Sequence, residues 1–149
     1  KGQARGQLVA ITPDNKPVLA PLEVSQFLMW LDTSNIELLK AAPAMKVEDV
    51  PIRRRWAHCT WTKQTGVQVN FETYSKGLIA KLTARRKTLL EALDAKFFRA
   101  LETKTDTTDI VKKKNTLRDL LTGIKATTTP DKLDEEFVKV SKQLDDFVI

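Results

Sequence analysis

The most reactive side chains stand next to each other at His58 and Cys59, the only histidine and the only cysteine of the chain. A cysteine and a histidine whose side chains meet can act as a nucleophile and its general base. However, the surrounding sequence, RWAHCTWT, alternates in the manner of a β-strand, and adjacent side chains of a strand point to opposite faces. One histidine and one cysteine also supply fewer than the three or four ligands that a zinc site requires. We therefore expect both residues to pack in a hairpin, with no catalytic and no metal-binding role.

The remaining polar residues show no spacing that is typical of an active site. Glu91, Asp94 and Glu102 fall in a stretch rich in lysine and arginine, where ion pairs on a helix surface explain them better than acid–base chemistry. The five glycines are scattered, and none belongs to a GxGxxG or GxxxxGK[ST] phosphate-binding loop. The sequence therefore predicts a protein that is not an enzyme, needs no cofactor and acts on no small-molecule substrate.

Clusters of basic residues are the strongest candidates for a binding role. The cluster RRRW at 53–56 combines guanidinium groups with an aromatic ring, which together can contact a protein partner or stack on the bases of a nucleic acid. The clusters RRK at 85–87 and KKK at 112–114 add positive charge. Alternatively, the tryptophans are buried under a hairpin and the arginine stems lie over them. The candidate contact residues are Arg53, Arg54, Arg55, Trp56 and Trp61.

The net charge of +6 is unevenly distributed along the chain. Residues 61–127 contain 14 basic and 7 acidic side chains, whereas residues 128–149 contain 3 basic and 6 acidic ones. One interpretation is that the acidic C-terminal region packs beside the basic middle, so that the two neutralise each other. The other is that the basic middle meets a nucleic acid or an acidic protein surface.

Composition limits the class of protein. With 42% apolar and 30% charged residues, the chain has the composition of a soluble globular domain. Its longest uncharged apolar cluster, Phe27 to Leu31, is far shorter than the roughly 18–20 residues that span a bilayer. The first residues, KGQARGQ, lack the apolar stretch of a signal peptide. We therefore expect no membrane contact.

The N-terminal part contains prolines and turn residues at short intervals. Pro13, Pro17 and Pro21 recur every four residues, which predicts an extended arm over residues 1–21. A helix should follow Pro21, and the segment IELLKAA predicts a second short helix that ends before Pro43. The apolar residues expected on one face of the first helix are Leu22, Phe27, Leu28, Trp30 and Leu31.

A β-hairpin is expected next. RWAHCTWT and GVQVNF both alternate, and KQTG between them is a plausible hairpin loop. A two-stranded hairpin alone is marginal in water, so the segment QLVAI of the arm is the candidate for a third strand. We expect residues 22–75 to form a docking region that contains the helix and this hairpin.

Helical periodicity dominates residues 76–149. We expect one helix from about Thr73 to Thr103, a second that ends near Gly123, and a third that Thr129 caps and Pro130 begins. In the second helix, Ile110, Leu117, Leu121 and Ile124 share one face, with Lys114 in the gap. Leu78 and Leu101 extend the apolar row of the first helix. The candidate seam for helix packing or self-association is Leu82, Leu89, Leu93, Phe97, Leu133, Phe137, Val140 and Leu144.

These periodicities predict an antiparallel bundle of three amphipathic helices, and an α+β, mainly α fold. The chain would divide into an arm (1–21), a docking region (22–75) and the bundle (76–149). Arg85, Arg86 and Lys87 fall off the leucine face and should lie in solvent.

Three segments follow one another within residues 79–136, namely ARRKTLLEALDAKFFRALE, IVKKKNTLRDL and ATTTPDKLDEEF. In this order they resemble the C-terminal region of small tailed-bacteriophage proteins of the tail-fibre and tail-assembly type. In that group an R-x-x-L-L-x-x-L-D helix continues into R-A-L-E and precedes a K-K-x-x-L-R-D helix. The group often has a tryptophan where this chain has Ala95 and Lys96.

The resemblance implies a virion structural or assembly protein, assembled in the host cytoplasm, that binds other tail proteins and carries no catalytic residues. The leading hypothesis is therefore a non-enzymatic phage tail protein that acts through protein–protein contacts and self-association. The alternative is a basic RNA-binding subunit of a large nucleoprotein assembly such as a ribosome, in which phosphate binding should weaken steeply with salt.

Overall fold

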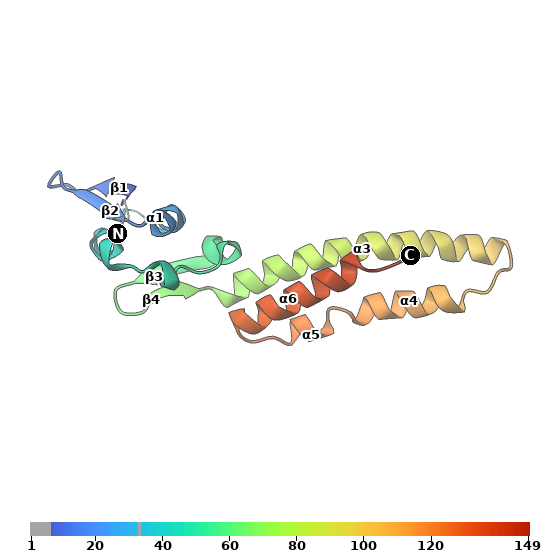
Figure 1. Cartoon of the computed structure of the whole chain (residues 1–149). Helices are drawn as coiled ribbons and strands as arrows, with labels where there is room; N and C mark the ends of the chain where they lie inside the picture. Colours follow the sequence, from blue (N-terminus) through green and yellow to red (C-terminus); the bar gives the residue numbers. More distant parts are fainter. Residues whose placement is uncertain (1–6, 33) are drawn as a thin grey trace, which may run out of the picture. The chain divides into compact units, whose positions relative to one another are not determined.

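The computed structural model describes residues 7–32 and 34–149 of the chain. The chain divides into two compact units, with the boundary between Asn70 and Phe71. The fold is α+β and mainly α, as predicted (Figure 1). The first unit holds two small antiparallel hairpins with short helices, and the second consists of helices. The predicted divisions after residues 21 and 75 differ from this boundary, because the first hairpin belongs to the first unit and the long helix begins earlier.

The first unit begins with a hairpin of strands β1 (Gln7–Ile11) and β2 (Pro17–Ala20). The turn is closed by hydrogen bonds from the Asn15 N–H to the Thr12 carbonyl (2.8 Å) and from the Thr12 N–H to the Lys16 carbonyl (2.9 Å). Asn15 has a φ of 61°, a left-handed conformation that asparagine tolerates better than most residues.

The prediction of an extended arm over residues 1–21 is therefore wrong for residues 7–20, and its residues 1–6 lie outside the described part of the chain. The prolines do not prevent pairing here. Pro17 is the first residue of a strand in a two-stranded sheet, a position where its missing N–H is tolerated.

Two short helices follow, α1 (Leu22–Leu28) after Pro21 and α2 (Ile36–Ala41) before Pro43, both close to the predicted positions. The Asn35 side chain caps α2 by accepting hydrogen bonds from two backbone N–H groups of its first turn. Of the residues expected on one face of α1, Leu22 and Trp30 are exposed instead. Because α1 ends at Leu28, helical spacing no longer applies to Trp30.

The second hairpin consists of β3 (Cys59–Thr62) and β4 (Gly66–Val69), which confirms the predicted hairpin. Its first strand is shorter than predicted, because residues 53–58 form a 3₁₀ turn, η3 (Arg53–His58). The segment QLVAI pairs only with β2 in the first sheet, so the prediction of a third strand here is wrong. Both sheets instead contribute to one apolar core with the short helices. Its most deeply buried side chains are Ala20, Val24, Phe27, Leu28, Leu38 and Ala42.

The second unit is built on one long helix, α3 (Phe71–Glu102), whose ends lie within two residues of the predicted ones. Three shorter helices follow, α4 (Thr108–Asp119), α5 (Thr122–Lys125) and α6 (Pro130–Asp145). The Thr129 hydroxyl accepts a hydrogen bond from the Lys132 N–H, so the predicted cap of α6 is confirmed. Gly123 lies inside α5 and does not end α4. Its φ is not positive, so this position does not require the left-handed conformation that favours glycine at a helix end.

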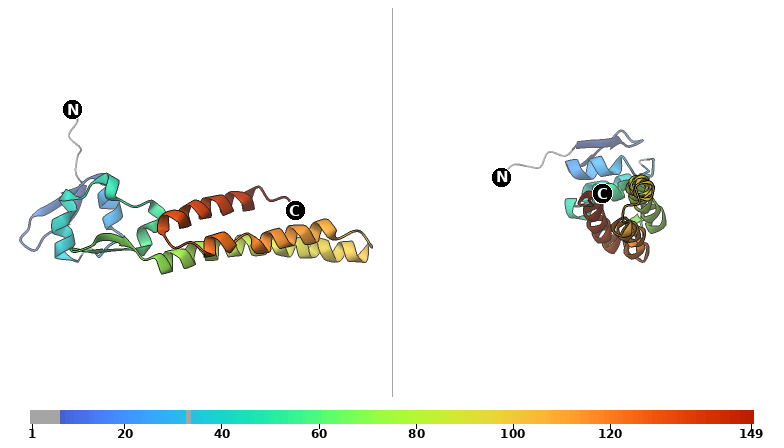
Figure 2. Two further views of the ribbon diagram at one scale, coloured as in Figure 1. Left: turned by 90° about the horizontal axis from the view of Figure 1, so that it is seen from below. Right: turned by 90° about the vertical axis from the view of Figure 1, so that its right-hand side faces the viewer.

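The directions of the helices follow from their contacts. Arg86 of α3 donates to the Arg118 carbonyl, and Asp94 pairs with Lys114, so α4 runs antiparallel to α3. Tyr74 binds Asp134, and Lys96 reaches the Ile149 carbonyl after α6, so α6 runs parallel to α3. This up-down-up arrangement confirms the predicted bundle. The α6 helix lies along the first half of α3, and α4 lies along the second half (Figures 1 and 2).

In the described part of the chain, none of the helices combines the length and the apolar character needed to cross a membrane.

Candidate functional site

The predicted contact residues of the RRRW cluster lie in η3. Arg53 and Arg54 are exposed and Arg55 is half-buried, whereas Trp56 is buried. The Trp56 indole N–H donates to the Pro51 carbonyl at 2.7 Å, and the ring centroid is 5.7 Å from that of Phe27. The Arg53 guanidinium carbon lies over the indole, 5.7 Å from its centroid. Trp56 is therefore a core residue covered by an arginine, and its ring offers no free face for stacking on a base.

Trp61 is placed differently. It is half-buried and lines a hollow of about 350 Å³ together with Met45, Asp49, Gly66 and Val67. Trp61 and Val67 are partners across the β3–β4 hairpin. At Gly66 a Cβ atom would meet nothing within 4 Å, so the hollow is open at this point. An indole, a thioether and one carboxylate can receive an apolar or a cationic side chain of another protein.

His58 and Cys59 do not form a reactive pair. His58 is the last residue of η3, while Cys59 is buried and its thiol donates to the Arg55 carbonyl at 3.2 Å. Burial raises the pKa of the Cys59 thiol, against the opposing influence of the Arg55 charge. Among the described residues, no group of three or more histidine, cysteine and acidic side chains is arranged to hold a metal ion.

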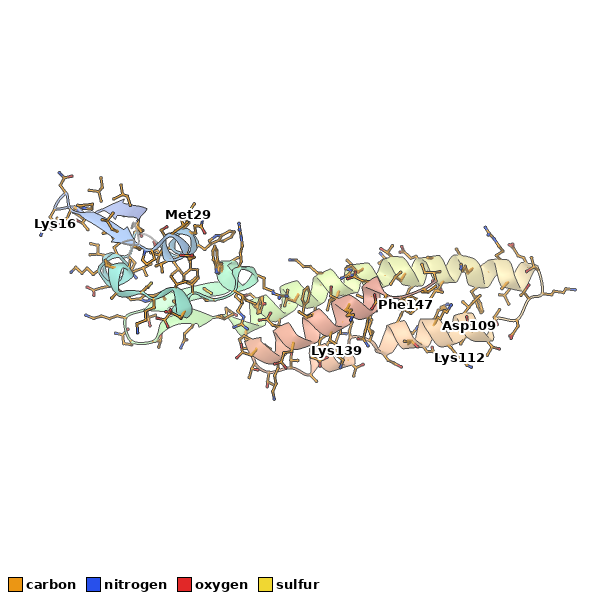
Figure 3. All side chains as sticks on the ribbon, viewed as in Figure 1. Lys16, Met29, Asp109, Lys112, Lys139 and Phe147 are labelled. Atoms are coloured by element: carbon orange, nitrogen blue, oxygen red, sulfur yellow. The ribbon has the colours of Figure 1, made fainter. Side chains whose placement is uncertain are left out.

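The outer face of the β1–β2 hairpin is apolar and exposed. Leu8 pairs with Leu19 and Ile11 with Pro17, and all four side chains are exposed. The alternate positions of β2, Val18 and Ala20, are buried in the core. Both faces of this hairpin carry apolar residues, but only one face packs on the core of the unit. The other face stays exposed, and exposed apolar patches of this kind mark contact surfaces. Met29, at the end of α1, is a further exposed apolar residue of this unit (Figure 3).

The predicted helix seam lies mostly inside the second unit. Five of its eight residues are buried there, namely Leu82, Leu93, Leu133, Val140 and Leu144. The other three, Leu89, Phe97 and Phe137, are half-buried. This seam packs the three helices of one chain together, and little of it is left for a second copy. Leu101, also expected on the apolar face, is exposed.

Basic residues of the second unit form contacts between its helices. Arg85 donates to the Ser141 hydroxyl (2.6 Å) and forms an ion pair with Asp145, both belonging to α6. Arg86 donates to the Arg118 carbonyl at the end of α4 (3.1 Å). Arg85 and Arg86 are half-buried, so the expectation that they lie in solvent holds only in part, because helix α3 has neighbours on both sides of its leucine stripe.

Lys87 is exposed, as predicted, and Lys112 is exposed as well. Figure 3 shows Lys112 pointing away from α3. Lys113 is half-buried and pairs with Asp109 of its own helix. Lys114 is the most buried of the cluster: its side chain is only 15% exposed, with Nζ 2.5 Å from Asp94 Oδ1 and 5.0 Å from the Phe97 ring centroid. Lys114, which interrupts the apolar face of α4 in the sequence, therefore forms an ion pair between α4 and α3.

Sequence reasoning missed one apolar surface of the second unit, formed by Phe98, Leu101 and Val111. Their exposed fractions are 63%, 52% and 39%. The sequence did contain a signal for this surface: Phe97 and Phe98 are adjacent, and two adjacent residues of a helix do not both lie on the same apolar stripe.

No family model, curated protein or solved structure matches this chain.

Proposed function

We propose that this chain is a non-enzymatic structural protein of a bacteriophage tail, or a factor in tail assembly, that acts through protein–protein contacts. The observation that carries the contact function is the outer face of the β1–β2 hairpin, where Leu8, Ile11 and Leu19 are exposed on a hairpin whose other face is already packed. The hollow beside Trp61 offers a second point of attachment in the same unit. The assignment to a phage tail is supported by the resemblance of residues 79–136.

Mass spectrometry of purified particles and of assembly intermediates tests the assignment. We expect the chain in one of the two. Its absence from both would contradict a tail function.

A substitution on the hairpin tests the surface. Leu19→Lys adds a charge to the outer face without touching the core, and we expect loss of the chain from particles or intermediates with normal helix content by circular dichroism. Thr60→Lys, at an exposed polar position of β3, is the matched control and should assemble normally. Equal assembly of both variants would contradict docking through this face.

A second candidate function is RNA binding, and the observation that favours it is the exposure of Arg53 and Arg54 at the start of η3. Fluorescence anisotropy with a labelled single-stranded RNA at about 50 mM salt measures it, because phosphate contacts are strong at low salt. If the variant with alanine at 53, 54 and 55 binds as well as the wild type, this function is excluded.

A further inference from the structure

The hollow beside Trp61 lies between the β3–β4 hairpin and a short turn that precedes it in the chain. Trp61 and Val67 are paired across the hairpin, and both pack against the edge of the apolar core without being buried in it. The 3₁₀ turn η2 (Val47–Asp49) contributes Asp49, and Met45 comes just before this turn. The indole, the thioether and the carboxylate therefore surround one hollow of about 350 Å³.

The two tryptophans of this region differ in what their rings already contact. The Trp56 indole donates its N–H to a backbone carbonyl, and the Arg53 guanidinium lies over its ring. In the part of the chain that the structure describes, Trp61 has neither kind of contact, and the exposed Asp49 carboxylate has no ion pair. The hollow thus combines an unstacked indole with an unpaired negative charge.

The lysines that are close to the hollow in sequence do not occupy it. Neither Lys46 nor Lys63 belongs to its lining. Lys63, in the turn of the hairpin, instead pairs with Glu37, with its Nζ 3.4 Å from the carboxylate. A cation for Asp49 therefore does not come from these neighbours.

The second unit shows what an aromatic ring and a carboxylate hold together. Lys114 Nζ lies 2.5 Å from Asp94 Oδ1 and 5.0 Å from the Phe97 ring centroid, and its side chain is only 15% exposed. The hollow offers the same two kinds of group in Asp49 and Trp61, and an indole attracts a cation more strongly than a phenyl ring does. The charge and the ring therefore favour a cationic occupant over an apolar one.

The shapes of the groups favour arginine over lysine. A guanidinium group is planar, so it can lie flat on the Trp61 indole while its N–H groups donate to the Asp49 carboxylate. An ammonium group is more strongly hydrated and loses more when it leaves water. Small-molecule sites measure roughly 300–1,000 Å³, so a hollow of about 350 Å³ suits one side chain better than a larger ligand.

We propose that this hollow binds an arginine side chain of a partner protein, with the guanidinium stacked on Trp61 and paired with Asp49. The proposal rests on the proposed contact function and names the chemistry of one attachment point. Because the hollow receives a single side chain, a short peptide can replace the partner in the test. A single side chain makes few contacts, so we expect a Kd of about 1–10 mM for such a peptide.

Nuclear magnetic resonance of the full ¹⁵N-labelled chain tests the proposal, with acetyl-Gly-Arg-Gly-amide as the probe at about 20 mM salt. The three indole N–H signals are assigned by replacing each tryptophan with phenylalanine. We expect the Trp61 signal to shift saturably, while those of Trp56, whose N–H is already bonded, and Trp30, outside the hollow, do not. The same peptide with the neutral citrulline in place of arginine should bind at least about threefold more weakly, because it cannot pair with a carboxylate.

Two neighbouring acidic residues provide a variant and its matched control. Asp49→Asn should weaken binding of the arginine peptide at least about threefold, because it removes the carboxylate that lines the hollow. Glu48→Gln removes the same charge at an exposed position outside the lining, and it should change binding by less than about twofold. Circular dichroism of both variants verifies that the fold is intact.

Several outcomes would overturn the proposal. These are a Trp61 signal that does not shift saturably, equal binding of the citrulline peptide, and equal effects of Asp49→Asn and Glu48→Gln. Equal binding of the corresponding lysine peptide would overturn the choice of arginine. If Arg5→Gln tightened peptide binding about tenfold, the occupant would be an arginine of the same chain and not of a partner.

The test is independent of the tail assignment, because it uses only the purified chain and a peptide. Absence of the chain from particles and intermediates would contradict the tail function and leave peptide binding unchanged. Failure of the peptide to bind would remove this attachment point and leave the result of the Leu19→Lys experiment unchanged.

Discussion

Arg85 and Arg86 are neighbours in sequence, yet they join α3 to different helices. Successive residues of a helix point about 100° apart, so Arg85 reaches Ser141 and Asp145 on α6 while Arg86 reaches the end of α4. The leucine stripe between them was readable from the sequence. That these arginines would have partners was not, because the position of α6 along α3 depends on contacts far apart in the chain.

The Arg85 contacts predict a measurable contribution to stability. We expect Arg85→Met to lower the free energy of unfolding by about 1–2 kcal/mol, because Ser141 and Asp145 lose their donor while the apolar stem remains. Urea unfolding followed by far-ultraviolet circular dichroism measures this change. Lys81→Met, at an exposed position of the same helix, should change stability by less than about 0.5 kcal/mol. Equal effects of the two substitutions would show that the Arg85 contacts add nothing.

Cys59 should react slowly and should make stability depend on alkaline pH. Since its pKa is raised by burial, the folded state holds the thiol protonated, and iodoacetamide at pH 8.5 should modify native protein at least about tenfold more slowly than urea-unfolded protein. As pH rises through about 9, the unfolded chain ionises first and stability falls. Melting curves between pH 8 and 10 should show a smaller loss for Cys59→Ala. Equal alkylation rates in the two states would contradict this burial.

At the scale of elements, the connection between α3 and α4 holds the clearest local strain. The Thr105 N–H donates to the Ala100 carbonyl (2.8 Å) and the Lys104 N–H to the Leu101 carbonyl (3.2 Å), which is the Schellman pattern of a helix end. Lys104 stands at the left-handed position, with a φ of 56°, where glycine is strongly preferred.

Lys104→Gly should therefore stabilise the second unit by about 0.5–1 kcal/mol, the relief of left-handed strain being partly offset by the greater freedom of glycine in the unfolded chain. Chemical denaturation measures this difference. Lys112→Gly, at an exposed position inside α4, should instead cost about 1 kcal/mol. A loss of stability in the Lys104 variant would contradict the strain at this turn.

The long helices were the most predictable elements, because a period maintained over many residues leaves few alternatives. The ends of α3 and the Thr129 cap of α6 follow from the residues there. The short elements were less predictable. The segment at 12–16 suits a hairpin turn as well as an arm, and only pairing with β1 decides between them. The alternation of RWAHCTWT suggested a strand from its start, whereas the burial of Trp56 against Phe27 places residues 53–58 in η3.

At the scale of the whole molecule, the candidate site residues fall into two groups: the predicted contact residues belong to the first unit, and the predicted helix seam belongs to the second. Of the two readings left open for the tryptophans, burial under an arginine holds for Trp56, which Arg53 covers. Trp61 is half-buried, and its contact role stays a prediction, because the sequence of a hairpin does not tell which of two tryptophans is the deeper one. The outer face of β1–β2 could not be predicted from residues read as an arm.

The division into two units predicts that residues 71–149 fold alone. All contacts of α3 described above are with α4, α6 and the segment after α6, so the fragment keeps its own core. We expect it to show a helical circular dichroism spectrum and a cooperative thermal transition within a few degrees of that of the second unit in the full chain. A fragment without a cooperative transition would contradict the independence of the unit.

The three tryptophans, Trp30, Trp56 and Trp61, all belong to the first unit, whereas the only tyrosine, Tyr74, belongs to the second. Fluorescence excited at 295 nm thus reports on one half of the chain alone, while ellipticity at 222 nm comes mainly from the other half. Two optical signals from one unlabelled sample therefore follow the two units separately, and two distinct melting curves would show that the halves unfold independently of each other.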